Sequence, residues 1–144
     1  MSAIVKLDAT APADADPVRE RRRMLLTSPN PRPGLNYLGL HRQTLPDVAL
    51  PAGMPAPLTI AFRFVPDRLI LDAQALPQYG VVLAAQEWTS PEALAAAAFD
   101  DLNNELVPRW LNLRLDAGDS HRVVLEDRQP GWETPHLLDR LEVW

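Results

Sequence analysis

Three histidines are the first side chains to consider for metal or acid-base chemistry. His41, His121 and His136 lie far apart in the chain, with no pair at a spacing of four residues and no adjacent carboxylate motif. Zinc sites in proteins are commonly built from ligands at such short spacings. We therefore expect no metal site from these residues.

The tripeptide Asp119-Ser120-His121 contains the residue types of a hydrolase triad. It falls in a predicted hairpin turn, where adjacent residues cannot adopt the geometry of a nucleophile and its base. Its composition is typical of a turn. The glycine-rich phosphate-binding motifs G-x-x-x-x-G-K and G-x-G-x-x-G are absent from the sequence.

Cysteine is absent from all 144 residues, and lysine occurs once, as Lys6. The chain therefore has neither a thiolate nor a disulfide. The net charge of −5 disfavours nucleic acid as the main partner. No apolar run approaches the ~18 residues of a membrane span, and the first residues do not resemble a secretory signal. We expect a cytoplasmic protein without a membrane partner.

Residues 1–29 are rich in proline, alanine and aspartate and offer little apolar periodicity. They predict a poorly ordered leader, followed by one domain over residues 30–144 with a C-terminal extension. The basic run from Arg19 to Arg23 is interpreted as a solvated arm rather than a binding patch. Such an arm could still order against a neighbouring subunit.

Alternating apolar residues predict strands in the first half of the domain. Residues 37–42 can form a short strand, and residues 58–65 alternate with period two, as in a half-buried strand. Pro66 and Asp67 predict a turn before the apolar residues 69–71. These two segments are expected to form a hairpin or one long bent strand.

The middle of the chain has helical signals. Ser90, Pro91 and Glu92 supply a hydroxyl cap, a proline at the first helical position and an acid in the first turn, so a helix is expected to about Leu106. Residues 77–88 are interpreted as a helix, although Val81 to Leu83 would also suit a strand.

After Pro108 the period returns to two, which predicts a second hairpin with its turn at residues 116–120. Strands, two helices and strands give an α+β domain, in which two helices cover one face of an antiparallel four-stranded sheet. The uncovered edges suggest a homo-oligomer. The tail, residues 129–144, predicts a terminal amphipathic helix or strand that could cap a neighbour's sheet edge.

Several segments together resemble the NADPH-dependent 7-cyano-7-deazaguanine reductases of queuosine biosynthesis, the QueF family. The resemblance covers about residues 30–115 and rests on Asn30-Pro-Arg-Pro33, Tyr37, Gly53-Met-Pro55, the strand at 58–67, the octet Asp72 to Tyr79, and the segments Asp100 to Leu102 and Val107 to Leu111. It implies a tunnelling fold (T-fold): a β-β-α-α-β-β unit that assembles into oligomeric barrels with ligand sites between subunits.

The resemblance also implies where the family's chemistry would lie. The nucleophilic cysteine, which forms a covalent thioimide with the nitrile, falls on Ala49, and the proton-shuttling aspartate falls on Ala56. Neither methyl group can attack a carbon or transfer a proton. The two octet lysines implicated in holding NADPH phosphates become Gln74 and Pro77. We therefore assign no catalytic residue and no cofactor.

One family group does carry over. The family's His-Glu pair at the start of the second helix falls on Pro91 and Glu92, and the glutamate grips the edge of a guanine-like base. Glu92 would then bind a purine- or pterin-like small molecule, although it would also suit a simple helix-dipole acid. One inserted residue leaves Glu87 as a substitute. Trp88 could stack on the ligand ring or belong to the core or an interface.

Three functions fit these observations. We favour a QueF-like protein that lacks the nitrile reductase nucleophile and retains at most a ligand site. The first alternative is a structural or regulatory oligomeric subunit. The second is a T-fold enzyme of different chemistry that uses Glu92 or Glu87 as an acid or base on a pterin or deazapurine.

Overall fold

The computed structural model describes residues 16–48, 50–51, 57–133 and 135–144. In chain order its elements are α1 (Pro17–Arg22), β1 (Thr27–Pro29), β2 (Gly39–Thr44), β3 (Leu58–Val65), β4 (Leu69–Leu71), α2 (Ala75–Ala85), α3 (Pro91–Leu106), β5 (Trp110–Ala117), β6 (His121–Arg128) and α4 (Pro135–Leu138). No helix in these ranges combines the length and the apolar composition that crossing a bilayer requires.

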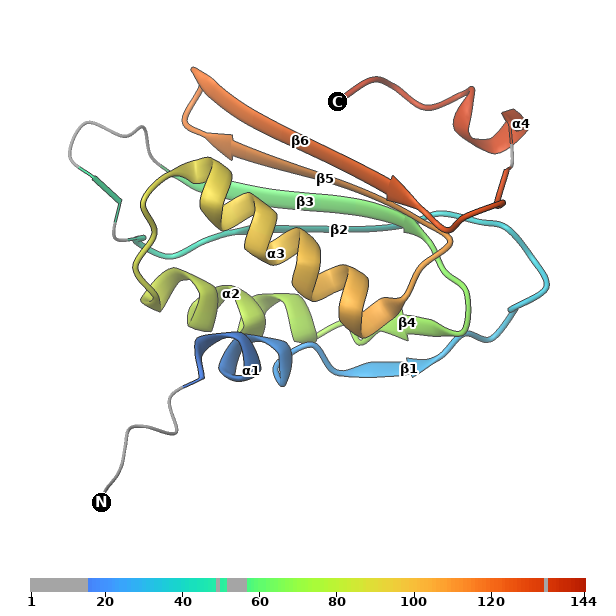
Figure 1. Ribbon diagram of the computed structural model, residues 1–144, viewed down its shortest axis with the longest axis horizontal. Helices are drawn as coiled ribbons and strands as arrows, with labels where there is room; N and C mark the ends of the chain where they lie inside the picture. The colour runs from blue at the N-terminus through green and yellow to red at the C-terminus, as the bar shows by residue number, and fades with distance from the viewer. Residues whose placement is uncertain (1–15, 49, 52–56, 134) are drawn as a thin grey trace.

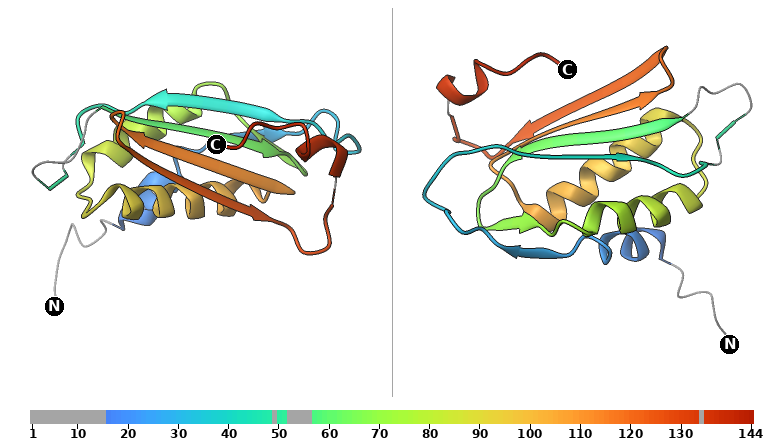
Figure 2. Two further views of the ribbon diagram at one scale, coloured as in Figure 1. Left: turned by 90° about the horizontal axis from the view of Figure 1, so that it is seen from above. Right: turned by 180° about the vertical axis from the view of Figure 1, so that it is seen from behind.

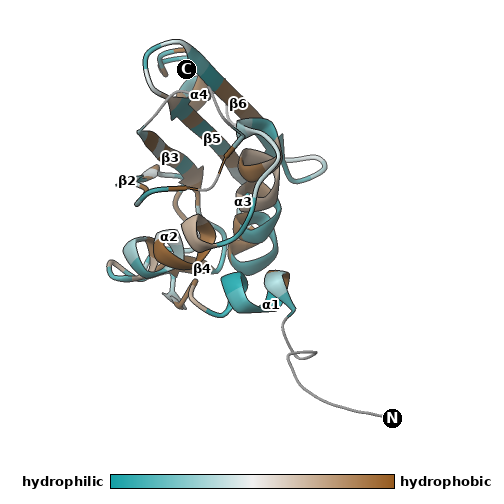
Figure 3. Ribbon diagram, turned by 90° about the vertical axis from the view of Figure 1, so that its left-hand side faces the viewer, coloured by the Kyte–Doolittle hydropathy of each residue, from teal (hydrophilic) through white to brown (hydrophobic). Residues whose placement is uncertain are grey.

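The main layer is an antiparallel sheet in the order β2-β3-β5-β6, and helices α2 and α3 lie side by side on one of its faces (Figure 1). Seen end on, the sheet and the helices form two layers with apolar residues between them (Figure 3). The predicted α+β class is confirmed. The order β2-β3-α2-α3-β5-β6 is compatible with a T-fold, and assembly into a barrel remains a prediction.

The core lies between the two central strands and the helices. In β3 and β5 every second residue faces the helices, and Phe62 pairs with Leu113 at the centre of the register. Both of these side chains are fully buried. Burial of side chains of this size contributes roughly 1.5–3 kcal/mol each. The period-two prediction for residues 58–65 is confirmed.

The predicted start of α3 is also confirmed. The Ser90 hydroxyl oxygen accepts a hydrogen bond of 3.1 Å from the amide of Ala93, and the helix ends at Leu106. Its C-cap, Val107, adopts the left-handed conformation with φ 44°. Helix α2 runs over Ala75–Ala85, slightly earlier than the predicted residues 77–88, so the segment that would also have suited a strand is helical.

Strand β4 corrects one prediction. Residues 69–71 were expected to form a hairpin with residues 58–65 or to continue that strand. Instead they pair with β1, where Ser28 lies opposite Ile70, in a separate two-stranded sheet. The Ser28 hydroxyl also donates a hydrogen bond to the carboxylate of Asp72. The chain leaves the main sheet after Val65, because Pro66 has no amide hydrogen with which to continue the ladder.

The second part of the predicted leader also belongs to the fold. Residues 1–15 lie outside the described residues, but Asp16 caps α1, which packs on α2 and α3. The basic run is therefore not simply a solvated arm, because the side chain of Arg21 is buried. The physical reason is an acidic partner, Asp101, that is 80 residues away in sequence.

The C-terminal tail lies across the sheet face opposite the helices (Figure 2). The guanidinium of Arg63 donates a hydrogen bond of 2.6 Å to the carbonyl of Glu142 and lies 4.2 Å from the centre of the Trp144 indole. Within the described part of the tail, the helix is confined to Pro135–Leu138. The tail therefore packs on its own subunit's sheet, and a role at a neighbour's edge remains a prediction.

Candidate functional site

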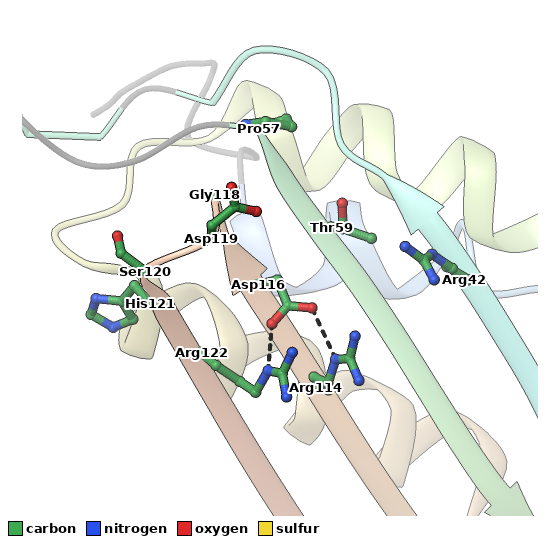
Figure 4. Close-up of a pocket in the computed structure, with 10 residues that line it drawn as sticks. All are labelled: Arg42, Pro57, Thr59, Arg114, Asp116, Gly118, Asp119, Ser120, His121 and Arg122. Carbon is green, nitrogen blue, oxygen red and sulfur yellow. Dashed lines mark hydrogen bonds and ion pairs between the residues drawn. The ribbon is translucent and has the colours of Figure 1, made fainter.

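A pocket of about 580 Å³ opens where the β5–β6 hairpin turns (Figure 4). In β5, Leu115 and Ala117 face the helices and are fully buried, so Arg114 and Asp116 lie on the opposite face of the sheet. Neighbouring strands add polar side chains on the same face. The lining residues are Arg42, Pro57, Thr59, Arg114, Asp116, Gly118, Asp119, Ser120, His121 and Arg122.

Asp116 organises the centre of this pocket. Its carboxylate accepts hydrogen bonds from Nε of Arg114 at 2.9 Å and from Nε of Arg122 at 2.7 Å. Partial burial alone would raise the pKa of Asp116, but these hydrogen bonds outweigh that effect and lower it. The carboxylate is therefore ionised at neutral pH and fixes two guanidinium groups.

Glu92 has a partner that the sequence did not reveal. Its Oε2 lies 2.6 Å from Nε2 of His121, with 59% of the Glu92 side chain and 32% of the His121 side chain exposed. The hydrogen bond from His121 is the main cause that lowers the pKa of Glu92. A carboxylate and an imidazole in contact can exchange or position a proton.

The Glu92–His121 pair lies on one side of the start of β6, and Asp116 with its two arginines lies on the other. His121 pairs with Ala117 in the register and so faces the helix layer, where α3 begins. In Figure 4 its ring points away from Asp116. His121 therefore forms the rim of the pocket and connects it to the N-terminal end of α3.

The two other predicted ligand residues lie in the segment between α2 and α3. Glu87 is exposed, and its side chain makes no hydrogen bond or ion pair with any other described residue. The Trp88 indole N–H donates a hydrogen bond of 2.8 Å to the carbonyl of Leu83, and the guanidinium of Arg21 lies 5.4 Å from the ring centre. These contacts give Trp88 a packing role, and its stacking on a ligand remains a prediction.

A buried ionic cluster fixes the helices behind the pocket. Asp101 in α3 is fully buried and accepts hydrogen bonds from Arg21 at 2.7 Å, from Arg22 at 2.8 Å and from the Tyr79 hydroxyl at 2.6 Å. Burial, followed by the charge of Asp101, raises the pKa of Tyr79 well above its ordinary value. Asp101, Arg21 and Tyr79 are buried, and 29% of the Arg22 side chain is exposed, so we assign the cluster to structure rather than to ligand binding.

Comparison with known proteins identifies relatives. The NADPH-dependent 7-cyano-7-deazaguanine reductases of two strains of Acidithiobacillus ferrooxidans are each 29% identical over 134 residues, covering 88% of this chain and 90% of the relative. The reductase of Nitrosococcus oceani is 28% identical over 123 residues, or 81% and 93% of the two chains. This chain is a distant homologue of the QueF family. No protein-family model matches it.

The QueF resemblance can now be placed on the structure. Ala49 and Ala56 lie outside the described residues. Gln74 precedes α2 and Pro77 lies in its first turn, and both are exposed. Pro91 and Glu92 lie at the start of α3, the position that the resemblance implies for them. Within the described ranges, no three His, Asp or Glu side chains gather as metal ligands.

His121 is the residue that sequence reasoning missed. It was interpreted as part of a turn, and the structure places it at the first position of β6 against Glu92. The signal that could have revealed this contact is the register of the β5–β6 hairpin. His121 lies opposite Ala117 on the sheet face that α3 covers, near the start of that helix. The sequence spacing of 29 residues concealed this contact.

Proposed function

We propose that this chain is a QueF-like protein that does not reduce nitriles through a thiolate and that binds a purine- or pterin-like small molecule at Glu92. The observation that carries the first part is the absence of cysteine from the whole sequence. A covalent adduct between an enzyme thiol and a nitrile carbon needs a sulfur nucleophile. No side chain of this protein supplies one.

The cofactor argument points the same way. The relatives are named as NADPH-dependent, and phosphate groups are commonly held by lysine or arginine. Lys6 is the single lysine of the chain, and the octet positions Gln74 and Pro77 are exposed without charge. NADPH binding at the octet therefore lacks its cationic groups.

The ligand argument rests on Glu92. Its carboxylate is exposed at the first turn of α3 and has a lowered pKa, so it is ionised at neutral pH. An ionised carboxylate can accept two N–H groups from the edge of a purine or pterin ring, and such charged hydrogen bonds contribute about 1.5–3 kcal/mol each. His121 would hold the carboxylate in place.

The test measures oxidation of NADPH in the presence of 7-cyano-7-deazaguanine, with an active QueF reductase as positive control. We expect no turnover above background, and measurable turnover would refute the first part. Calorimetry with guanine and with pterin tests the second part. Glu92→Gln should weaken binding about tenfold or more. Glu133→Gln should not, because Glu133 is exposed and its side chain has no partner among the described residues. Equal affinities in both variants would exclude Glu92 as the ligand group.

The Glu92–His121 contact favours one second candidate, an enzyme of different chemistry on the same class of ligand. The two side chains supply the acid-base pair that Glu92 alone could not. If a pterin or deazapurine is converted by the purified protein, His121→Gln should reduce the turnover by about 10²–10⁴-fold. Unchanged turnover in that variant would exclude the pair from the reaction.

Exposed apolar residues on both edges of the main sheet favour subunit association. On β2, 64% of Leu40 is exposed, and on β6, 40% of Val124 is exposed. Unpaired edge strands favour pairing with other chains. We propose a homo-oligomer, and a monomeric mass by light scattering across a broad concentration range would contradict it.

A further inference from the structure

We propose that the pocket at the β5–β6 turn binds a small ligand through a phosphate-type oxyanion. His121, the partner of Glu92, also lines this pocket, but the proposal does not depend on the function proposed for Glu92. Three arginines, Arg42, Arg114 and Arg122, line the pocket together with two acids, Asp116 and Asp119. Their formal charges leave one positive charge, in a protein whose net charge is −5.

The register explains why the cations gather here. Arg42 lies opposite Ala61, and Ala61 lies opposite Arg114, so the three residues form one row across β2, β3 and β5. The middle residue, Ala61, has only a methyl side chain and is buried, so the polar groups on this row come from the two arginines. Thr59 lies in the next row, opposite Asp116, and adds a hydroxyl group.

Asp116 orients Arg114 and Arg122 through their Nε atoms and leaves their terminal guanidinium nitrogens available. It accepts from Nε of Arg114 and Nε of Arg122, and a guanidinium has five N–H donors, of which four are on the terminal nitrogens. Among the residues that the structure describes, these terminal nitrogens make no hydrogen bond. Two oriented guanidinium groups with unused N–H donors can hydrogen-bond to the oxygens of a phosphate group.

Arg42 supplies the third cation. It is exposed, and its side chain makes no hydrogen bond or ion pair within the described ranges. In Figure 4 its side chain lies beside Thr59, on the far side of the pocket from Arg122. The hydroxyl of Ser120 lines the same pocket at the hairpin turn. The donors thus come from four strands and the turn, whereas the single central acid is already neutralised by two arginines.

The size of the pocket favours a small ligand over a polymer. A volume of about 580 Å³ is within the usual range for small-molecule sites. The overall negative charge of the chain disfavours a nucleic-acid backbone as the source of the phosphate. A phosphate monoester or inorganic phosphate fits the donors and the volume.

The experiment is a calorimetric titration of the full chain with inorganic phosphate and, separately, with acetate, at constant ionic strength in chloride. We expect phosphate to bind more tightly than acetate. Arg42→Gln should weaken phosphate binding about tenfold or more. The fold should persist in this variant, because the Arg42 side chain makes no hydrogen bond or ion pair with a described residue and the backbone pairing with Ala61 is kept. Circular dichroism checks this.

Arg68→Gln is the matched control, since it removes an exposed arginine that also has no side-chain partner among the described residues. Phosphate affinity should remain unchanged in this variant. Three results would overturn the proposal: no heat of binding with phosphate, acetate affinity equal to or above phosphate affinity, or the same loss in Arg68→Gln as in Arg42→Gln. The last result would mean that only overall charge matters.

Discussion

The guanidinium of Arg21 donates a hydrogen bond of 2.7 Å to the carboxylate of Asp101, and this contact joins the N-terminal helix to the centre of α3. Asp101 is fully buried, and 5% of Arg21 is exposed. Burial opposes the charge of Arg21, but the hydrogen bond and charge of Asp101 outweigh it and raise the pKa of Arg21. Arg21 is thus charged and lies inside the protein against Asp101.

Replacing Asp101 by alanine should strongly destabilise the fold. The change leaves Arg21, Arg22 and the Tyr79 hydroxyl without their acceptor, and breaking a buried ion pair from one side costs about 3–5 kcal/mol. Urea unfolding measures the difference. Asp100→Ala is the control. Asp100 is the exposed neighbour of Asp101 in the sequence, so its replacement should change the free energy of unfolding little. Equal midpoints for the two variants would contradict the role of the cluster.

Removal of His121 should raise the pKa of Glu92 towards its ordinary value. The hydrogen bond from His121 is the first cause that lowers this pKa in the folded protein. A group with a lowered folded pKa stabilises the fold above its unfolded pKa, and this contribution is lost as the pH falls through the folded pKa.

Carbon-detected NMR titration of the Glu92 carboxyl group measures the shift in His121→Ala. His136→Ala is the control, because His136 is exposed and lies in α4, away from α3. The pKa of Glu92 should stay low in that variant. A pKa of Glu92 that does not change when His121 is removed would show that the contact is not formed in solution.

Replacing Val107 by glycine should stabilise the protein by about 1 kcal/mol. Val107 caps α3 with φ 44°, a left-handed conformation that a β-branched residue adopts at a cost and glycine adopts freely. The opposite sign is expected for Val81→Gly, since Val81 is an exposed interior residue of α2 and glycine there weakens a helix. Thermal unfolding of both variants measures the two changes in stability. If both variants were stabilised, or both destabilised, this account would be wrong.

Replacing Gly39 by alanine should destabilise the main sheet by roughly 1–3 kcal/mol. A Cβ atom at this position would lie 2.6 Å from Cε1 of Phe64, a core ring that is 2% exposed. The ring cannot move without disturbing its packing. Gly34→Ala is the control, because a Cβ atom there would meet nothing within 4 Å. Equal denaturation midpoints would show that Phe64 can adjust.

The parts of the fold that were predictable depend on neighbours in sequence. Ser90 and Pro91 mark the start of α3, and the alternation over residues 58–65 marks β3, because capping and strand periodicity are local properties. The pairing of β1 with β4 was missed because short strands have little periodicity of their own, and their partner is chosen by tertiary packing.

The same distinction applies to the candidate site. Glu92 was identified from the resemblance and its position at a helix start, and the structure confirms that position. Its contact with His121 and the row formed by Arg42, Ala61 and Arg114 arise from strand register, which one sequence does not specify. The buried state of Arg21 likewise depends on an acid 80 residues away.

The C-terminal indole has an optical consequence. Trp144 stacks on Arg63 and lies 5.5 Å from the guanidinium of Arg114, which lines the arginine pocket. A fluorophore native to the chain therefore lies beside that cavity, and its emission depends on the position and charge of the nearby cation. Occupancy of the cavity can be followed by fluorescence without attaching a label, and comparison with Trp144→Phe isolates this signal from the other three tryptophans.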